Sequence, residues 1–266
     1  MLECEGFDFE DFSLVLSGGG ALGIAHIGVL KELEKRAIYP SEIVGTSMGG
    51  IIGACLAIGL QVLDIYRFIE KFAGIQNWFR FSLSGNSIVQ SRRIEEIFDK
   101  VFSNLKMKDA AIPLKIITTQ LSTGRVKTFD KSDDIYIKDA LLATMAIPGI
   151  FEEKEINSKI YVDGFLCENL GVNQATKSDV LALDVLGKNS FSKTLPSSII
   201  KTKNIFDMFE KSLRILIYNQ TINALQRCEK NVKIIDIDTK NYKTYHFHKY
   251  QEIEKLGEEA FKSAFL

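Results

Sequence analysis

Residues 43–50 read IVGTSMGG and place Gly45, Ser47 and Gly49 in the pattern G-x-S-x-G. An apolar run typical of a buried strand precedes the serine, and a helical pattern follows it. A serine on such a tight turn is lifted out of the sheet, and the helix start favours negative charge near it. The glycines leave room where neighbouring backbone comes close. The stretch predicts either a nucleophile elbow or a turn whose serine only caps the helix.

A second glycine-rich turn, GGGALG, lies upstream at residues 18–23. It separates an expected strand over 13–17 from an expected helix over 21–36, and amides at a helix start bind anions. The anion is either a dinucleotide pyrophosphate or the oxyanion of an acyl-transfer intermediate. A dinucleotide site needs an acidic residue at the end of the next strand. That place holds Gly45-Thr46-Ser47, so an oxyanion hole is the favoured interpretation.

A serine nucleophile needs a base, and the chain offers few. Asp163 follows an expected strand over 160–162 and could reach the serine, although an ordinary turn aspartate has the same pattern. Among the three histidines, His26 lies inside the first expected helix and is expected to be structural. His246 and His248 lie in a polar stretch, and either could complete a Ser-His-Asp set.

Strand and helix patterns alternate along the whole chain, which predicts an α/β domain whose largely parallel sheet is covered by helices on both faces. No repeat or low-complexity linker interrupts residues 1–266, so a single domain is expected, with 188–198 as its one flexible insertion. The remaining expected strands are 42–46, 114–121, 125–129, 179–186 and 232–237, and residues 156–162 are expected to form two strands around an Asn-Ser turn at 157–158. The remaining expected helices are 48–58, 62–72, 91–102, 137–145, 204–228 and 250–264.

Composition excludes several classes of protein. The 33 Lys and Arg and 34 Asp and Glu give a formal net charge of −1, which argues against nucleic-acid binding through bulk positive charge. Cys4, Cys55, Cys167 and Cys228 form no CxxC pair, so we expect no zinc site or disulfide framework and a reducing, cytoplasmic compartment.

The acidic N-terminus does not resemble a secretory signal. The uncharged residues 43–60 are expected to form a buried strand and helix rather than a membrane span.

Three stretches together resemble the signature blocks of patatin-like phospholipases, in particular bacterial members with a single such domain. They are LVLSGGGALGIAHIGVLKELE at 14–34, IVGTSMGG at 43–50 and MAIPGIFEEKEINSKIYVDG at 145–164. Their order and spacing agree with that family from about residue 13 to about 185. The resemblance implies a three-layer α/β/α fold with a mostly parallel central sheet, followed by a helical, basic part over 186–266.

The resemblance also assigns roles by motif. It makes Ser47 the nucleophile and Asp163 its base, without a histidine, and burial should raise the pKa of that aspartate. The implied oxyanion hole comprises Gly18, Gly19, Gly20 and Gly23; the nucleophile elbow has Gly45 and Gly49; and the candidate substrate-binding residues are Met48, Pro148 and Phe165. The chain departs from the family pattern at Leu22, where Arg is frequent, at Phe165, where Gly or Ala is usual, and at Gly171, where Pro is usual.

The implied activity is hydrolysis of carboxylic esters of phospholipids or lysophospholipids through a covalent acyl-enzyme. No cofactor or metal is expected. Two alternatives stay open. One is a Ser-His-Asp esterase or thioesterase that uses His246 or His248. The other is a lipid-sensing regulatory module with a weak or vestigial site.

Three features bear on contact with lipid. Residues 74–87 interleave aromatic and basic side chains, which suits either a membrane boundary or a mobile loop packed on the core. Residues 188–249 carry 12 Lys and Arg against 5 Asp and Glu, a surplus that either forms an ordinary solvated face or attracts an anionic membrane to a peripheral protein. The expected helix over 204–228 has an apolar side that is expected to pack in the core, with lining of the acyl pocket as the alternative. That side comprises Phe206, Phe209, Leu213, Leu216 and Ile217.

Overall fold

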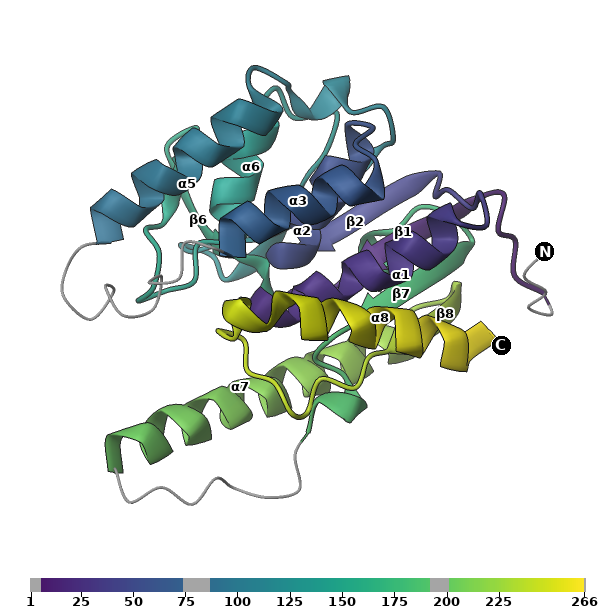
Figure 1. Cartoon of the computed structure of the whole chain (residues 1–266). Helices are drawn as coiled ribbons and strands as arrows, with labels where there is room; N and C mark the ends of the chain where they lie inside the picture. Colours follow the sequence, from purple (N-terminus) through teal and green to yellow (C-terminus); the bar gives the residue numbers. More distant parts are fainter. Residues whose placement is uncertain (1–5, 74–86, 192–200, 266) are drawn as a thin grey trace.

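The computed structural model describes residues 6–73, 87–191 and 201–265, without the side chains of 72–73, 87–92 and 201–206 (Figure 1). The predicted aromatic segment 74–87 and most of the predicted insertion 188–198 lie outside the described residues.

One sheet of eight strands organises the described residues, and five adjacent strands of it are parallel. In spatial order these are β8 (Asn231–Asp236), β7 (Asp179–Asp184), β1 (Phe12–Leu16), β2 (Glu42–Thr46) and β3 (Leu114–Gln120). Antiparallel strands extend the β3 side: β4 (Arg125–Phe129), β5 (Lys154–Ile156) and β6 (Lys159–Asp163). The predicted mostly parallel central sheet is confirmed.

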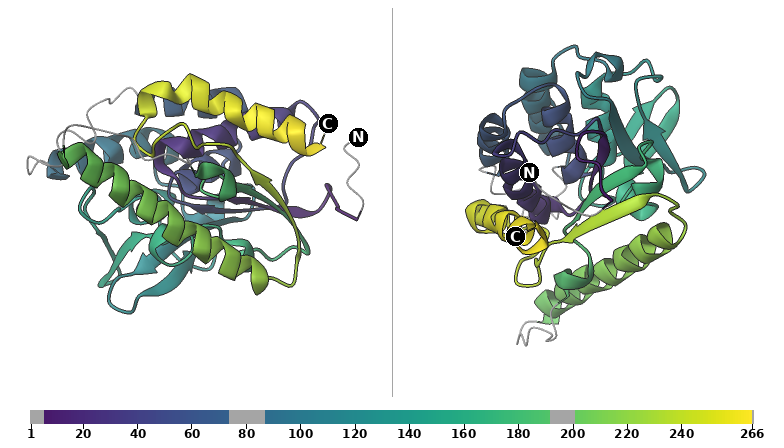
Figure 2. Two further views of the ribbon diagram at one scale, coloured as in Figure 1. Left: turned by 90° about the horizontal axis from the view of Figure 1, so that it is seen from below. Right: turned by 90° about the vertical axis from the view of Figure 1, so that its right-hand side faces the viewer.

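Helices cover the two faces of the sheet unequally (Figures 1 and 2). The large core on one face is covered by α1 (Ala25–Glu34), α2 (Met48–Ala57), α3 (Val62–Ala73), α5 (Ser87–Phe102), α6 (Ile137–Thr144) and α8 (Tyr250–Phe265). Of the described α-helices, α7 (Lys201–Gln226) alone contributes to the smaller core on the other face. Short 3₁₀ helices complete the chain: η1 (Gly20–Ile24), η2 (Met107–Asp109), η3 (Gly164–Leu166), η4 (Val172–Gln174), η5 (Lys188–Ser190) and η6 (Phe247–Lys249).

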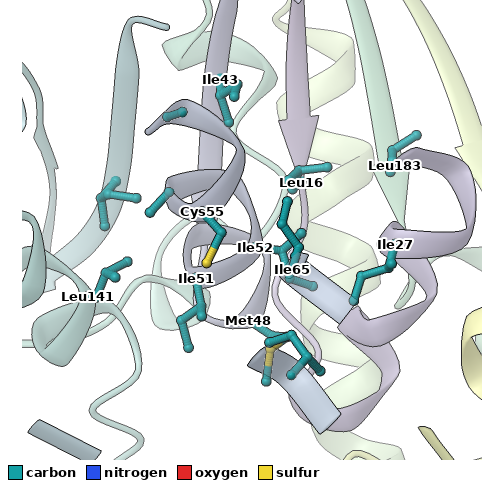
Figure 3. Close-up of a cluster of buried hydrophobic side chains, with 14 of the residues drawn as sticks. Leu16, Ile27, Ile43, Met48, Ile51, Ile52, Cys55, Ile65, Leu141 and Leu183 are labelled. Atoms are coloured by element: carbon teal, nitrogen blue, oxygen red, sulfur yellow. The ribbon is translucent and has the colours of Figure 1, made fainter. Parts of the chain in front are cut away.

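The two cores follow from the alternation of side chains along the central strands. Leu14 and Leu16 of β1 point into the large core, and Val15 between them points into the small one. Figure 3 shows the large core, where Leu16 lies beside the α2 side chains Ile52 and Cys55. Because β1 is fully buried on both faces, it reads as a continuous apolar run.

The sheet register decides where the functional residues meet. β2 and β6 lie end to end on the same edge of β3, because β4 occupies its other edge. Thr46 of β2 pairs with Ile117, and Asp163 of β6 pairs with the next residue, Thr118. β2 runs parallel to β3 and β6 runs antiparallel, so their carboxyl ends face each other. Ser47 therefore emerges from one strand end opposite Asp163 at the other.

The packing of α7 differs from the prediction. Phe209 and Leu216 are exposed, so the prediction that they pack in the core is wrong. Ile217 is buried and Leu213 is half-buried. The helix runs along an outer edge of the molecule (Figure 1). Its apolar residues therefore spread over a wider part of the helix surface than the rest of the protein covers. The side chain of Phe206 lies outside the described residues.

Helices α1 and α8 touch through two glycines. A Cβ atom at Gly257 would lie 1.8 Å from the carbonyl oxygen of Ala25, and one at Gly28 would lie 2.1 Å from that of Glu254. Atoms cannot approach so closely, so only residues without a side chain allow this contact. The contact fixes α8 over the first signature block.

Gly257→Ala is expected to lower the free energy of unfolding by about 2 kcal/mol, because the added methyl group must push α1 and α8 apart. Urea denaturation at 25 °C measures the change. Ser263→Ala, at an exposed position of the same helix, is the matched control and should change stability by less than about 0.5 kcal/mol. Equal stability of the two variants would contradict the close approach.

Candidate active site

Ser47 lies on a strained turn between β2 and α2. Its φ of 52° and ψ of −125° are unfavourable for a residue with a side chain. A Cβ atom at Gly45 would lie 2.6 Å from the Cα atom of Gly50, and one at Gly49 would lie 2.4 Å from the carbonyl oxygen of Leu16. The two glycines of the motif are therefore required because the strand and helix backbones meet there.

A buried threonine holds this turn in place. The Ser47 N–H donates to Oγ1 of Thr144 at 2.8 Å, and the Thr144 hydroxyl donates to the carbonyl oxygen of Ile117 at 2.6 Å. Thr144 thereby ties the serine to α6 and to β3. The sequence analysis did not identify this residue, and its one local signal is a threonine at the end of a mostly apolar helix.

Asp163 is fully buried at the end of β6. Burial raises the pKa of its carboxyl group to about 7, opposed by the hydrogen bond from the Phe165 N–H (3.0 Å to Oδ1) and by the nearby Ser47 hydroxyl. Oδ2 has no partner of ordinary hydrogen-bond geometry among the described residues. The Ser47 hydroxyl lies near the carboxyl group, where it opposes the rise in the Asp163 pKa.

The glycine loop presents a free amide beside the serine. Nδ2 of buried Asn169 donates to the carbonyl oxygen of Gly18 at 3.2 Å. Because the peptide unit is planar and trans, the N–H of Gly19 points away from that oxygen. Among the described residues, we find no acceptor for the Gly19 N–H. Gly19 also lines the cavity that contains Ser47, so its amide is suited to binding an anion there.

A C-terminal segment supports the other side of this loop. Gly20 has a φ of 55°, and a Cβ atom there would lie 2.4 Å from the carbonyl oxygen of Thr244. That oxygen accepts a hydrogen bond from the Ala21 N–H at 2.8 Å. Arg214 of α7 donates to the carbonyl oxygen of Tyr242 at 2.6 Å and so holds the segment. The sequence analysis did not identify this support.

Ser47 and Asp163 share a cavity of about 740 Å³, a size typical of small-molecule sites. Its wall is mostly apolar and includes the three predicted substrate-binding residues, Met48, Pro148 and Phe165. Helix α7 contributes Phe209, Leu213 and Ile217, and the C-terminal segment contributes Thr244, Tyr245 and Phe247. Such a wall is suited to an aliphatic chain.

Two of the four predicted oxyanion glycines, Gly19 and Gly20, line this cavity. Gly18 lies beside the serine, since a Cβ atom on it would be 3.1 Å from the Cβ of Ser47. Gly23 is outside the lining and packs against Met48, where a Cβ atom would be 2.7 Å from Cγ.

The structure does not bring a histidine to Ser47. His26 is fully buried; its Nε2 lies 2.9 Å from the carbonyl oxygen of Ser17, and burial lowers its pKa to about 4. Nδ1 of His246 accepts a hydrogen bond from the Lys243 N–H, and neither His246 nor His248 lines the cavity. Within the described residues, no three His, Cys, Asp or Glu side chains gather as metal ligands would.

Asn169→Asp is expected to lower the kcat for a soluble acyl ester about 10- to 100-fold with little change in KM, because the Gly18 carbonyl loses its donor and the Gly19 amide loses its orientation. Steady-state kinetics at pH 8 measure the effect. Asn173→Asp is the matched control, since Asn173 also donates to a backbone carbonyl, that of Ala224. Equal kcat in the two variants would exclude a positioning role for Asn169.

Comparison with known proteins gives matches over most of the chain. The family model described as patatin-like phospholipase matches residues 14–176. Lysophospholipase NTE1 of Kluyveromyces lactis is 28% identical over 268 residues, which covers 92% of this chain and 18% of that protein. The Saccharomyces cerevisiae protein of the same name is 27% identical over 276 residues, which covers 93% of this chain and 16% of that protein. The chain thus spans less than a fifth of the length of these relatives.

Solved structures give more distant matches. VipD from Legionella pneumophila aligns with a TM-score of 0.47 and 12% identity, covering 96% of this chain and 67% of that one. The type III effector protein ExoU aligns with a TM-score of 0.45 and 12% identity, covering 96% of this chain and 53% of that one.

Proposed function

The chain belongs to the patatin-like phospholipase family, and from this premise we propose that it hydrolyses carboxylic esters of phospholipids or lysophospholipids through Ser47 and Asp163. One observation carries the proposal: a strained serine, a buried carboxyl group with a pKa of about 7 and a free amide of Gly19 meet in one apolar cavity. Because the similar proteins are named lysophospholipase, we favour single-chain lipids as the substrates of this protein.

The proposed reaction has two halves. Asp163 accepts the Ser47 hydroxyl proton while Oγ attacks the ester carbonyl, and the Gly19 N–H stabilises the resulting oxyanion. The intermediate collapses to an acyl-enzyme, and Asp163 returns the proton to the leaving alcohol. Asp163 then deprotonates a water molecule, which attacks the acyl group. The fatty acid leaves, and the proton returns to Ser47.

Burial is what allows a carboxylate to replace histidine as the base. An exposed aspartate has a pKa near 4 and is a weak base at neutral pH. A pKa of about 7 brings Asp163 into the range of histidine, where a base is both largely ionised and reactive at physiological pH. In this proposal the apolar wall with Met48, Pro148 and Phe165 receives the acyl chain and also keeps water from the carboxylate.

We further propose that residues 1–266 act as a single domain. The C-terminal part is built into the site rather than appended to it. α8 packs on α1 through Gly257, and Thr244 supports the glycine loop at Gly20. Residues from Phe209 to Phe247 complete the cavity wall.

We also propose that the protein is cytoplasmic and makes peripheral contact with anionic membranes. Its support is the surplus of basic residues over 188–249. None of the described helices has the length and apolar composition to cross a bilayer.

Ser47→Ala and Asp163→Asn are each expected to lower fatty-acid release from lysophosphatidylcholine by on the order of 10³-fold or more, because each removes a reacting group. Titration of released fatty acid measures the loss, and a fluorophosphonate probe should label the parent protein but not Ser47→Ala. The double variant His246→Ala, His248→Ala is the control and should stay within about twofold of the parent. Activity that survives in Ser47→Ala would refute the proposal.

The pH profile should report the buried carboxyl group. Asp163 acts only when deprotonated, so kcat/KM should rise about tenfold per pH unit below pH 7 and level off above it. Assays with a soluble ester between pH 5 and pH 9 measure the midpoint. A midpoint near 4 would mean that the reacting carboxyl group is exposed to water and would contradict the buried base.

A further inference from the structure

Helix α7 carries an exposed apolar strip. Met208, Phe209, Ile215 and Leu216 are 57%, 62%, 51% and 60% exposed. Met208 and Ile215 are seven residues apart, as are Phe209 and Leu216, so each pair stacks two turns apart on one side of the helix. Large apolar side chains gathered in this way mark an interaction surface. Figures 1 and 2 show α7 along an outer edge of the molecule.

The opposite side of α7 is fully engaged with the protein. Arg214 is buried and donates to the carbonyl oxygens of Ser190 and Tyr242. Asp207 is buried and pairs with Lys243, and Ile217 is buried beside the cavity. These contacts fix the orientation of the helix, so the apolar strip is held outward.

The strip is continuous with the mouth of the Ser47 cavity. Phe209 belongs to the strip and also lines the cavity. Leu166, which is 40% exposed and lies just after Asp163 and Phe165, lines the cavity as well. Gln220 of α7 donates to the Leu166 carbonyl oxygen at 3.0 Å and ties the two elements together. An apolar path therefore runs from the outer surface to the serine.

The chemistry of the strip suits a lipid surface. Ser212, the polar residue between its two apolar pairs, donates its hydroxyl to the Met208 carbonyl oxygen at 2.8 Å, which lowers the cost of removing it from water. No residue of the strip is charged, whereas the stretch of sequence that contains α7, residues 188–249, carries a surplus of seven positive charges. An apolar helix face in a basic segment is typical of helices that lie in the interface of anionic bilayers.

We propose that Met208, Phe209, Ser212, Ile215 and Leu216 of α7, hereafter the α7 strip, dock on the surface of anionic lipid bilayers, so that a lipid ester passes directly from the bilayer into the Ser47 cavity. The inference rests on the proposed function for the identity of the molecule that enters. Docking itself is independent of catalysis.

The double variant Ile215→Gln, Leu216→Gln tests the α7 strip without altering the cavity, since neither residue lines it. Leu63→Gln, Leu121→Gln is the matched control, because these residues are 54% and 52% exposed on other elements. Cosedimentation with vesicles of phosphatidylcholine and phosphatidylglycerol measures binding at 0.15 M and 0.5 M NaCl. The strip variant should bind about tenfold less than the parent at both salt concentrations, and the control should bind within twofold of the parent.

Catalytic assays separate docking from chemistry. Turnover of p-nitrophenyl butyrate in solution should be the same for the parent and both variants, which also shows that the strip variant is folded. Turnover of lysophosphatidylcholine embedded in the vesicles should fall only in the strip variant. Equal vesicle binding by the strip variant and the parent would overturn the docking proposal. So would a parent dimer, by light scattering, that the strip variant loses while vesicle binding is unchanged. Lack of turnover by the parent would refute the proposed function but not docking.

Discussion

The pairing of β3 with two different strands on one edge is the constraint on which the site depends. β2 ends opposite Ile117 and β6 ends opposite Thr118, from opposite directions. A one-residue slip in either register would turn Ser47 or Asp163 to the other face of the sheet. Thr144 reinforces this register because its hydroxyl bridges the Ser47 N–H and the Ile117 carbonyl oxygen. The geometry of the dyad is therefore a property of the whole sheet.

This arrangement costs stability. The carboxyl group of Asp163 has a pKa of about 7 in the fold against 3.8 in the unfolded chain, so its ionised form is disfavoured by about 4 kcal/mol above pH 7. The cost is absent below the unfolded pKa and grows as pH rises between the two values. Ser47 adds backbone strain at its positive φ. The large apolar core and the close α1–α8 contact at Gly257 offset these costs.

The features that depend on short stretches of sequence were predicted correctly. The central strands, the turn at Ser47 and the β5–β6 hairpin followed from apolar runs, glycines and an Asn-Ser turn. Thr144 and Asn169 could not be predicted, because each acts through a hydrogen bond to a residue distant in sequence. The exposure of Phe209 and Leu216 was also unpredictable. Periodicity shows which residues share a helix face, but the tertiary arrangement decides whether anything covers it.

Docking and catalysis would be linked through the solvation of the base. Desolvation is the largest cause of the raised pKa of Asp163. An acyl chain that fills the cavity removes water from the same wall, and a bilayer against the α7 strip would cover Phe209 and Leu166, the exposed side chains that line it. Both changes lower the local dielectric and raise the pKa further, so a carboxylate that is ionised becomes a stronger base while a smaller fraction is ionised at pH 7. A lipid in the site would therefore favour the proton transfer from Ser47 to the ionised form and move the pH dependence of the reaction upward.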